Sequence, residues 1–385
     1  MNFGFSEEQE LLRATARKFL ENECPSSTVR KLMDTPEGTT PEFWAKLAEQ
    51  GWLGLIFPEA YGGVGLGVVD LVVLMEEMGR VVMPGPYLST VLLGGLALLE
   101  AGSEAQKKQW LPKIAAGETR ATLALTEPNA RWDAQGVTAT AAATGGGAFT
   151  LSGTKLFVPD AHVADLLVVA ARTGPGAVGA AAGSEDGVSL FLVPRRAPGL
   201  EVTLLPTMDQ TRKLCEVKLA GVRVPADALL GVAGQGWRPL RRVLERATVA
   251  LCAEMCGGAQ RVLEMTTEYA KIRIAFGKPI GAYQGVKHKA ADMLVEVENA
   301  KSITYYTAWA VDENAPDATL AVSMAKACVS DAYRRVAGAG IQLHGGIGFT
   351  WEHDLHLYFK RAKSSEFTFG DATHHRERVA QLINL

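Results

Sequence analysis

The sequence predicts an α+β protein with three regions, in which a helical N-terminal region and a C-terminal four-helix bundle flank a β-domain. Apolar residues recur at helical spacing up to about residue 118 and again after Gln235, whereas the stretch between them holds short alternating or β-branched runs. A chain of 385 residues also exceeds the size at which a single core keeps growing. We therefore expect an N-terminal domain over 1–118, a middle domain over 119–228 and a C-terminal domain over 229–385.

The N-terminal domain is predicted to be all-α. Ser6 followed by Gln9 is typical of a helix start, and apolar residues from Leu11 to Phe19 recur at the spacing of one helix face. Further helices are expected over 41–50, 66–79, 90–101 and 104–114.

The middle domain is predicted to consist of strands, and the C-terminal domain of long helices. The candidate strands are 137–141, 148–152, 166–171, 189–193 and 215–224. The glycine-rich stretch between Arg172 and Gly187 predicts a flexible hairpin tip to which we assign no chemistry. Helical segments over 237–271, 284–314, 317–337 and 353–359 predict an antiparallel bundle.

Composition and charge exclude several classes of protein. With 48% hydrophobic residues and a net charge of −3, the chain is neither a disordered nor a nucleic-acid-binding sequence. Its apolar stretches are too short, or too often interrupted by glycine, to span a bilayer. The N-terminal segment is charged and amphipathic, unlike a secretion signal. We therefore expect a cytoplasmic protein that does not enter membranes.

The cysteines and histidines predict no metal site. The five cysteines are widely spaced, and Cys252 and Cys256, one helical turn apart, have no histidine nearby in sequence. We expect both to be buried apolar side chains without a disulfide. The adjacent pair His374-His375 is expected at a surface or an interface.

A stretch around one helix end carries the first candidate binding site. Arg273, the pair Phe276-Gly277 and Gln284 lie close together in sequence where a helix stops. A guanidinium holds a pyrophosphate through two parallel charge-assisted hydrogen bonds, and a glutamine amide can donate to phosphate or accept from ribose or adenine. These groups suit FAD. The alternative is an ordinary helix end with a surface arginine.

Three further segments point to the same cofactor. In the segment 342–350, Gly345 and Gly346 let backbone amides approach a nucleotide, although a glycine-rich turn between helices would look similar. One further segment comprises Gly117-Glu118 and, after five residues, Ala124–Pro128. The last segment is Leu151–Asp165.

In sequence and in their order along the chain, the four segments resemble the acyl-CoA dehydrogenase family, and the resemblance runs from Phe5 to nearly the C-terminus. It implies an N-terminal all-α domain, a middle β-barrel or sandwich and a C-terminal four-helix bundle. It also implies FAD, an acyl-CoA thioester as substrate and an electron-transfer flavoprotein as electron acceptor. The residues it assigns to FAD are Thr126 beside the flavin ring and, for the tail reached across a dimer interface, Arg273, Phe276, Gln284, Gln342, Gly345 and Gly346.

The resemblance does not extend to the catalytic base. Family members remove the α-proton of the thioester with a carboxylate while hydride leaves Cβ for the flavin, and a positioned base contributes about 10²–10⁴-fold. In many members the base precedes a glycine that follows an Arg-Ala-Lys stretch, where this chain has Phe369. In others it lies on the first long C-terminal helix, where this chain has Ala247. Neither side chain accepts a proton.

Nearby carboxylates are poor substitutes for the missing base. On an α-helix, Glu245 is rotated by about 200° from Ala247, and Glu254 lies about 10 Å further along the axis. Asp371 is the carboxylate nearest to the C-terminal position, with Glu366 on the preceding turn. We keep Asp371 as a candidate base beside the simpler interpretation that it caps the following helix.

The sequence departs from the family's pattern at two other places in the part of the site that carries out the chemistry. The family usually has Gly-Ser-Asp where this chain has Arg131-Trp132-Asp133, which replaces the small residues that admit the pantetheine and thioester. Where many members place a Thr or Ser hydroxyl at flavin N5, this chain has Pro159, which has neither a hydroxyl nor an N–H.

Four hypotheses therefore remain open. The leading one is a subunit of an α2β2 acyl-CoA dehydrogenase for bulky, steroid-type thioesters, whose partner supplies the base and the flavin-ring pocket. The second is a self-sufficient homotetrameric dehydrogenase with a relocated base such as Asp371. The third is a flavin-dependent monooxygenase on the same fold, and the fourth is a non-catalytic scaffold or CoA-ester binding protein.

Overall fold

The computed structural model describes residues 4–173 and 185–385, so most of the expected glycine-rich hairpin tip lies outside the described residues. The chain packs into two compact units. We call them the bundle unit (residues 1–31, 67–83 and 248–385) and the β unit (residues 32–66 and 84–247). This grouping puts early helices together with the C-terminal ones, and the three-domain boundaries at 118 and 228 stay a prediction.

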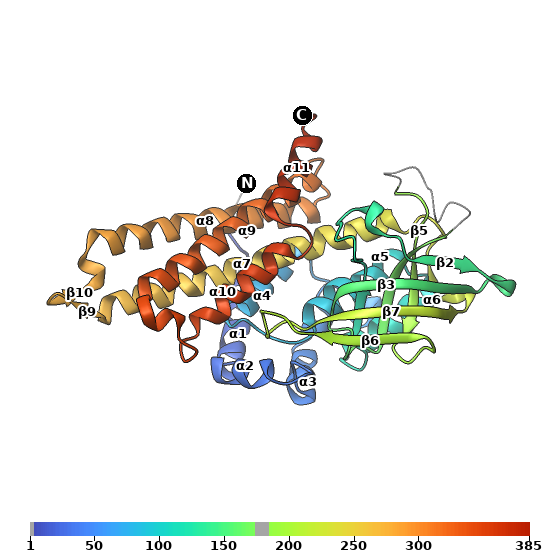
Figure 1. Cartoon of the computed structure of the whole chain (residues 1–385), viewed down its shortest axis with the longest axis horizontal. Helices are drawn as coiled ribbons and strands as arrows, with labels where there is room; N and C mark the ends of the chain where they lie inside the picture. The colour runs from blue at the N-terminus through green and yellow to red at the C-terminus, as the bar shows by residue number, and fades with distance from the viewer. Residues whose placement is uncertain (1–3, 174–184) are drawn as a thin grey trace. The chain divides into compact units, whose positions relative to one another are not determined.

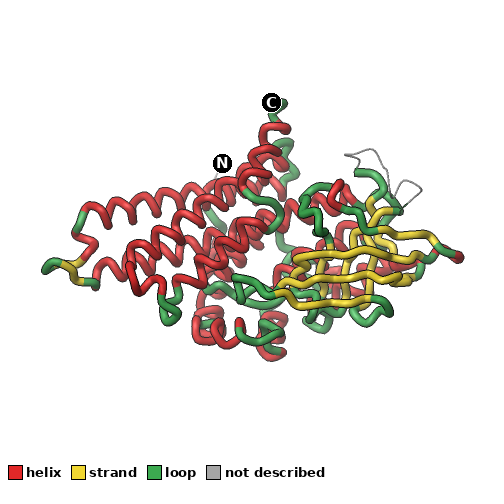
Figure 2. The backbone as a smooth tube through the Cα atoms, viewed as in Figure 1, coloured by secondary structure: helices red, strands yellow, loops and turns green. Residues whose placement is uncertain are grey.

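The bundle unit is built from long helices (Figures 1 and 2). Its main helices are α1 (Glu7–Glu23), α4 (Val68–Arg80), α8 (Gln284–Asp312), α9 (Ala318–His344), α10 (Leu355–Phe367), α11 (Ala372–Leu382) and the part of α7 (Trp237–Ile272) from Thr248 onward. The helix start at Ser6 is confirmed, because Ser6 and Gln9 form a reciprocal capping box. Figure 1 shows α8 and α9 side by side, as expected for consecutive helices of an antiparallel bundle.

Two glycines let α4 and α7 cross in near contact. A Cβ added at Gly79 would lie 1.9 Å from the carbonyl oxygen of Glu254, and one added at Gly257 would lie 1.8 Å from that of Glu76. Each helix therefore contributes one glycine to the crossing. Any side chain at either position would push the two helices apart.

The described strands of the β unit form one eight-stranded sheet, in the order β6-β7-β3-β2-β4-β5-β8 with β1 parallel to β4. The strands are β1 (Ala121–Ala124), β2 (Thr140–Ala143), β3 (Phe149–Pro159), β4 (Leu166–Arg172), β5 (Val188–Pro194), β6 (Leu200–Leu205), β7 (Leu214–Val224) and β8 (Leu229–Leu230). Strand β4 is buried along its whole length, and β5 is buried up to Val193, which explains their continuous apolar sequences. The unit also contains α3 (Pro41–Glu49), α5 (Leu96–Ala101) and α6 (Glu104–Ala115).

Several sequence-based boundaries were wrong. The strand expected over 137–141 begins only at Thr140, because Ala134–Gly136 forms a 3₁₀ turn and the carbonyl of Val137 accepts a hydrogen bond from Arg172 at 2.8 Å. The helix expected over 90–101 is a π-helical segment, Leu88–Gly95, followed by α5. The pattern also missed α2 (Ser26–Met33), α11, β1 and β6, which are short or largely polar.

Candidate functional site

The bundle unit presents a β-hairpin at the tip where α7 ends and α8 begins (Figure 1). Strands β9 (Ile274–Ala275) and β10 (Lys278–Pro279) pair across the two-residue turn Phe276-Gly277. Both turn residues have positive φ, 51° and 82°, which is the geometry that matches the twist of a tight hairpin. The turn holds the Phe276 ring outward, and 96% of that residue is exposed.

The hairpin stands beside the glycine-rich turn predicted to bind the same cofactor. The Tyr269 ring on α7 stacks on the His344 imidazole on α9 with 4.4 Å between centroids. Arg273 follows Tyr269 by one turn, and Gly345 follows His344 directly. The structure therefore brings the two segments predicted to bind the FAD tail to one end of the bundle unit.

The glycine-rich turn leaves space for a ligand. Gly345 ends α9 at φ 64° and ψ −141°, a conformation that favours glycine, and a Cβ added at Gly345 or Gly346 would meet no atom within 4 Å. Phe349, in the same turn, is 82% exposed. Ordinary folding leaves few large rings this exposed, so this end of the unit has the character of a binding surface.

These residues fit the tail of FAD. Arg273, Gln284 and Gln342 are exposed and offer a guanidinium and two amides. Phe276 and Phe349 offer exposed apolar rings. The set combines donors for a pyrophosphate with apolar surface for a nucleoside, which is the chemistry that a dinucleotide requires.

In the β unit, the two segments expected beside the flavin ring are neighbours. The N–H of Leu156 on β3 donates to the carbonyl of Thr126 at 2.8 Å. The next residue, Phe157, has φ 54° and is 53% exposed. Strand β3 shifts its register against β7 between Lys155 and Val158, and this bulge turns Phe157 outward.

A buried ion pair fixes the loop that carries Thr126. Lys155 Nζ lies 2.6 Å from Glu127 Oε1, and both side chains are almost fully buried. Glu127 also accepts from the backbone N–H groups of Thr138 and Ala139 at 3.0 Å. Burial lowers the pKa of Lys155, and the adjacent carboxylate opposes that shift. The sequence pattern includes Glu127 in its motif but did not reveal this role.

The segment Arg131–Asp133, predicted to replace the family's small residues, forms hydrogen bonds within itself and with the turn that follows it. Arg131 donates to the Asp133 carboxylate at 3.1 and 2.6 Å, and Asp133 accepts from the N–H of Gly136 at 3.2 Å. The Pro159 carbonyl accepts from the Thr122 hydroxyl at 2.6 Å. Neither Arg131 nor Pro159 therefore supplies the small polar contact that the family has at these positions.

The two positions predicted for the base, Ala247 and Phe369, carry apolar side chains. Ala247 is fully buried on α7. Phe369 has φ 63° in the turn between α10 and α11, and its carbonyl accepts from His375 Nε2 at 3.0 Å. His375 is buried within the chain, so the expectation that this pair lies at a surface is wrong for His375, and its alternative, an interface, stays a prediction.

Lys326, a buried lysine on α9, anchors the same turn. Its Nζ lies 3.0, 2.9 and 2.9 Å from the carbonyl oxygens of Ser365, Glu366 and Gly370. Burial lowers the pKa of Lys326 to about 8. Lys326 was not among the residues predicted from the sequence. Its position among the apolar residues of α9 was the available signal, because a lysine on a core face needs buried acceptors.

The candidate substitutes for the base all have structural partners. Asp371 is the N-cap of α11 and accepts from the N–H of His374 at 2.8 Å, which is the capping interpretation. Glu366 pairs with Lys363 at 2.5 Å and with Arg334 at 3.6 Å. Glu254 is buried in an ion pair with Arg361.

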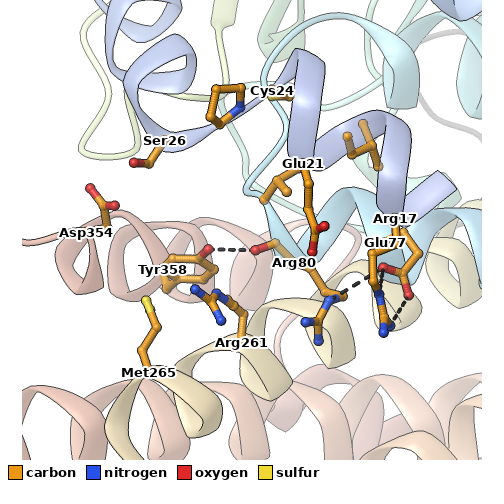
Figure 3. Close-up of a pocket in the computed structure, with 13 residues that line it drawn as sticks. Arg17, Glu21, Cys24, Ser26, Glu77, Arg80, Arg261, Met265, Asp354 and Tyr358 are labelled. Carbon is orange, nitrogen blue, oxygen red and sulfur yellow. Dashed lines mark hydrogen bonds and ion pairs between the residues drawn. The ribbon is translucent and has the colours of Figure 1, made fainter. Parts of the chain in front are cut away.

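The bundle unit also contains a cavity of about 240 Å³ between α1, α4, α7 and α10 (Figure 3). Its arginines are satisfied by neighbouring carboxylates: Arg17 holds Glu77 with two hydrogen bonds of 2.9 and 2.7 Å, and Arg80 holds Glu264 with two of 2.8 Å. Figure 3 shows Arg17 and Arg80 both directed at Glu77. Paired in this way, they stabilise the helix packing and leave little charge for an anion.

Within residues 4–173 and 185–385, no three or more histidine, cysteine, aspartate or glutamate side chains gather as a metal site would require. Cys252 and Cys256 are fully buried thiols, as expected. In the same described ranges, no helix is both long enough and apolar enough to cross a membrane.

Comparisons with known proteins cover the whole chain. Sequence profiles of the acyl-CoA dehydrogenase N-terminal, middle and C-terminal domains match residues 6–118, 122–222 and 234–383. A probable acyl-CoA dehydrogenase of Bacillus subtilis, YngJ, is 31% identical over the full length of both chains. These matches confirm the predicted fold class, with helical N-terminal and C-terminal domains around a β-domain.

Solved structures agree with this result. Butyryl-CoA dehydrogenase of Megasphaera elsdenii superposes with a TM-score of 0.92 at 27% identity, covering all of both chains. A chain of the ChsE4-ChsE5 complex of Mycobacterium tuberculosis superposes with a TM-score of 0.89 at 29% identity, and the match covers 100% of this chain and 99% of the other. A chain of the Tcur3481-Tcur3483 steroid acyl-CoA dehydrogenase gives 0.85 at 32% identity, covering 98% of both.

Proposed function

This chain belongs to the acyl-CoA dehydrogenase family, and from that premise we propose that it is one subunit of a hetero-oligomeric enzyme whose partner supplies the catalytic base. As a family member it is an FAD-dependent oxidoreductase acting on acyl-CoA. The proposal concerns how the active site is divided between two chains.

The observation that carries the proposal is the side chain at each base position. Phe369 and Ala247 have no group that accepts a proton. Of the nearby carboxylates, Asp371 caps α11 and Glu254 is paired with Arg361. Glu245 is rotated by about 200° from Ala247 on α7. Removing a buried carboxylate from its ion pair to act as a base would leave Arg361 uncompensated, which costs about 3–5 kcal/mol.

The residues that remain suit a cofactor-binding role. When bound, FAD supplies a two-electron oxidant. Arg273, Gln284 and Gln342 hold the pyrophosphate and adenosine at the tip of the bundle unit, with Phe276 against the tail. In family members this tail-binding surface serves the FAD of a neighbouring subunit, so a chain without a base still completes its partner's site.

The substrate and the electron acceptor are part of the proposal. The similarity to the steroid acyl-CoA dehydrogenase and to the ChsE4-ChsE5 complex supports a bulky CoA thioester and a two-chain enzyme. We also propose an electron-transfer flavoprotein as the acceptor and the cytoplasm as the location.

The test is to purify the chain alone and together with an acyl-CoA dehydrogenase-like partner and to measure flavin content and dehydrogenation. We expect about one FAD for every two chains in an active complex, and little flavin or activity in the single chain. Full flavin and full activity in the single chain would contradict the proposal and favour a homotetramer with its own base.

The same purification separates the other hypotheses. Oxygen uptake that requires a separate flavin reductase would indicate the monooxygenase. No flavin and no turnover with any partner would indicate a scaffold or CoA-ester binding protein.

A further inference from the structure

The stack of Tyr269 on His344 connects the two segments that are proposed to hold the FAD tail. Tyr269 lies one helical turn before Arg273, whose N–H donates to the Tyr269 carbonyl at 2.9 Å, and His344 ends α9 directly before Gly345. The two rings are nearly parallel, with an interplanar angle of 18°. All of these residues belong to the bundle unit. The stack therefore sets the distance between the two halves of the tail site.

His344 is held as a neutral imidazole. Its Nδ1 lies 2.8 Å from the carbonyl oxygen of Gly340, which can only accept, so Nδ1 carries the ring proton. The Nε2 atom therefore has a free lone pair, and it is buried with no hydrogen-bond partner among the described residues. Only 4% of His344 is exposed. A proton added at Nε2 would create a buried cation whose new N–H has no acceptor.

The titratable side chains that face His344 do not supply a compensating negative charge. Tyr269 from α7 covers one face of the imidazole. His353, from the segment before α10, meets it edge-on with 4.7 Å between ring centroids. His353 Nδ1 accepts from the N–H of Leu355 at 3.2 Å, so this second imidazole is neutral as well.

Burial outweighs the two features that favour a charged His344. The C-terminal end of α9 carries partial negative charge, and the face of Tyr269 attracts a cation. Burial nevertheless lowers the pKa of His344; the hydrogen bond to Gly340 opposes this shift, and the neighbouring His353 adds to it. Asp354, next to His353 in sequence, is paired with Arg30 at 2.8 Å, so its charge is already balanced.

We propose that His344 is a pH-sensitive positioning residue of the FAD-tail site, whose protonation breaks the stack on Tyr269 and releases the tail. The inference rests on the proposed function, because it takes Arg273 and the turn at Gly345 as the groups that hold the tail. Arg273 is attached to one ring of the stack and Gly345 to the other. Opening the stack therefore separates the two halves of the tail site.

The direction of the pH effect follows from the burial of His344. An imidazole that reaches water binds a proton near about pH 6.5, whereas the stacked ring binds it only at lower pH. The stacked state is therefore fully favoured above about pH 6.5. Below that pH the opened state gains up to about tenfold for each pH unit, until the stacked ring itself is protonated. Because the tail leaves through the opened state, its release rate rises in the same proportion.

The first experiment measures the protonation of His344 and requires no cofactor. The protein is labelled with ¹³C in its histidines, and the Cε1 resonances are followed by NMR from about pH 7.5 down to about pH 5. The resonance that is missing from H344F identifies His344. We expect its titration midpoint to lie clearly below about 6.5.

The second experiment measures FAD release from the complex on dilution, by flavin fluorescence at about pH 7.5 and about pH 5.5. For the parent protein we expect release to be about tenfold faster at the lower pH. H344F keeps an aromatic ring without a titrating nitrogen, so it should remove this difference. The control is H374Q, which changes a histidine on α11 outside the tail site and should keep the difference.

A matched pair of variants tests the stack at constant pH. Y269L removes the ring that covers His344, whereas Y269F keeps it. At about pH 7.5, Y269L should release FAD about three- to tenfold faster than Y269F, as expected for the loss of one aromatic pair. H344F also loses the hydrogen bond to Gly340, so the Tyr269 pair is an independent test of the same contact.

Three results would overturn the inference: a His344 midpoint at or above about 6.5, the same pH dependence of release in H344F and the parent protein, or equal release from Y269L and Y269F. Each leaves the proposed function intact if the complex holds FAD at about pH 7.5. A complex without FAD at that pH would contradict the proposed function and the inference together. The two failures are therefore distinguishable.

Discussion

Lys326 Nζ lies 2.9 Å from the carbonyl oxygen of Gly370, and this contact joins a buried charge on α9 to the turn that carries Phe369. The same ammonium lies within hydrogen-bond distance of the carbonyls of Ser365 and Glu366. The turn that places Phe369 at the predicted position of the base is thus anchored by a buried donor.

The first prediction concerns Lys326. Lys326→Met leaves the carbonyls at the end of α10 without their buried donor, and each such loss costs about 1–3 kcal/mol. We expect the free energy of unfolding to fall by about 3 kcal/mol in urea titrations. Lys289→Met, on the exposed face of α8, is the control and should change it by less than about 0.5 kcal/mol.

The second prediction is a pH dependence at His375. Burial, and then the charge of Lys326, lower the pKa of His375 to about 3, whereas the unfolded imidazole titrates near about 6.5. Between these values the unfolded chain binds the additional proton, so stability falls as the pH is lowered from about 6.5 towards about 3. His375→Gln can keep the hydrogen bond to the Phe369 carbonyl and should flatten this slope by up to about 1.4 kcal/mol per pH unit. Parallel curves of Tm against pH for both proteins would contradict the assignment.

The third prediction separates capping from catalysis at Asp371. Asn caps helices as well as Asp does, so Asp371→Asn should keep both stability and flavin reduction by acyl-CoA in the complex. Asp371→Ala should cost about 1 kcal/mol of stability and leave the rate of flavin bleaching unchanged. Loss of bleaching in Asp371→Asn would identify Asp371 as the base and support the self-sufficient enzyme.

The fourth prediction uses two glycines within helices. Gly257→Ala places a methyl group against the Glu76 carbonyl and should destabilise the protein by about 3 kcal/mol. Gly338→Ala on α9 meets nothing within 4 Å and should stabilise it by about 0.5–1 kcal/mol, because Ala favours a helix over Gly. The Tm of both variants, measured by thermal unfolding, tests the close crossing of α4 and α7. An equal change of Tm in the two variants would argue against that close crossing.

The fifth prediction addresses the FAD tail. Arg273→Gln should weaken FAD retention in the complex about tenfold, because it removes a charge-assisted contact to the pyrophosphate. Arg273→Lys should lose less, since it keeps the charge without the bidentate geometry. Fluorescence of released flavin during dilution measures both. Retention equal to that of the parent protein in Arg273→Gln would show that the arginine is only a surface residue.

Part of the site was predictable because its signals are local in sequence. Gly277 and Gly345 indicate their backbone geometry through residue type, and the structure gives both of them a positive φ. The positive φ of Phe276 is not indicated by its residue type and follows from the tight hairpin that the structure forms there. The absence of a carboxylate at Phe369 and Ala247 is equally a property of the sequence.

The partners of buried charges were not predictable in this way. Lys155 and Glu127 are 28 residues apart, and Arg361 and Glu254 are 107 apart. Nothing in either local pattern indicates that these side chains meet, because ion pairs depend on which helices and strands pack together.

By itself, the sequence determined the helical and strand periodicities, the glycine-rich turns and the chemistry that is missing at the base positions, since each depends on residues close together in the chain. Only the tertiary structure decided that Tyr269 stacks on His344, that Lys326 anchors the Phe369 turn and that His353 meets His344 edge-on. Those relationships arise when distant segments exclude water between them, and the burial that results sets both the strength of each contact and the pKa of each charge.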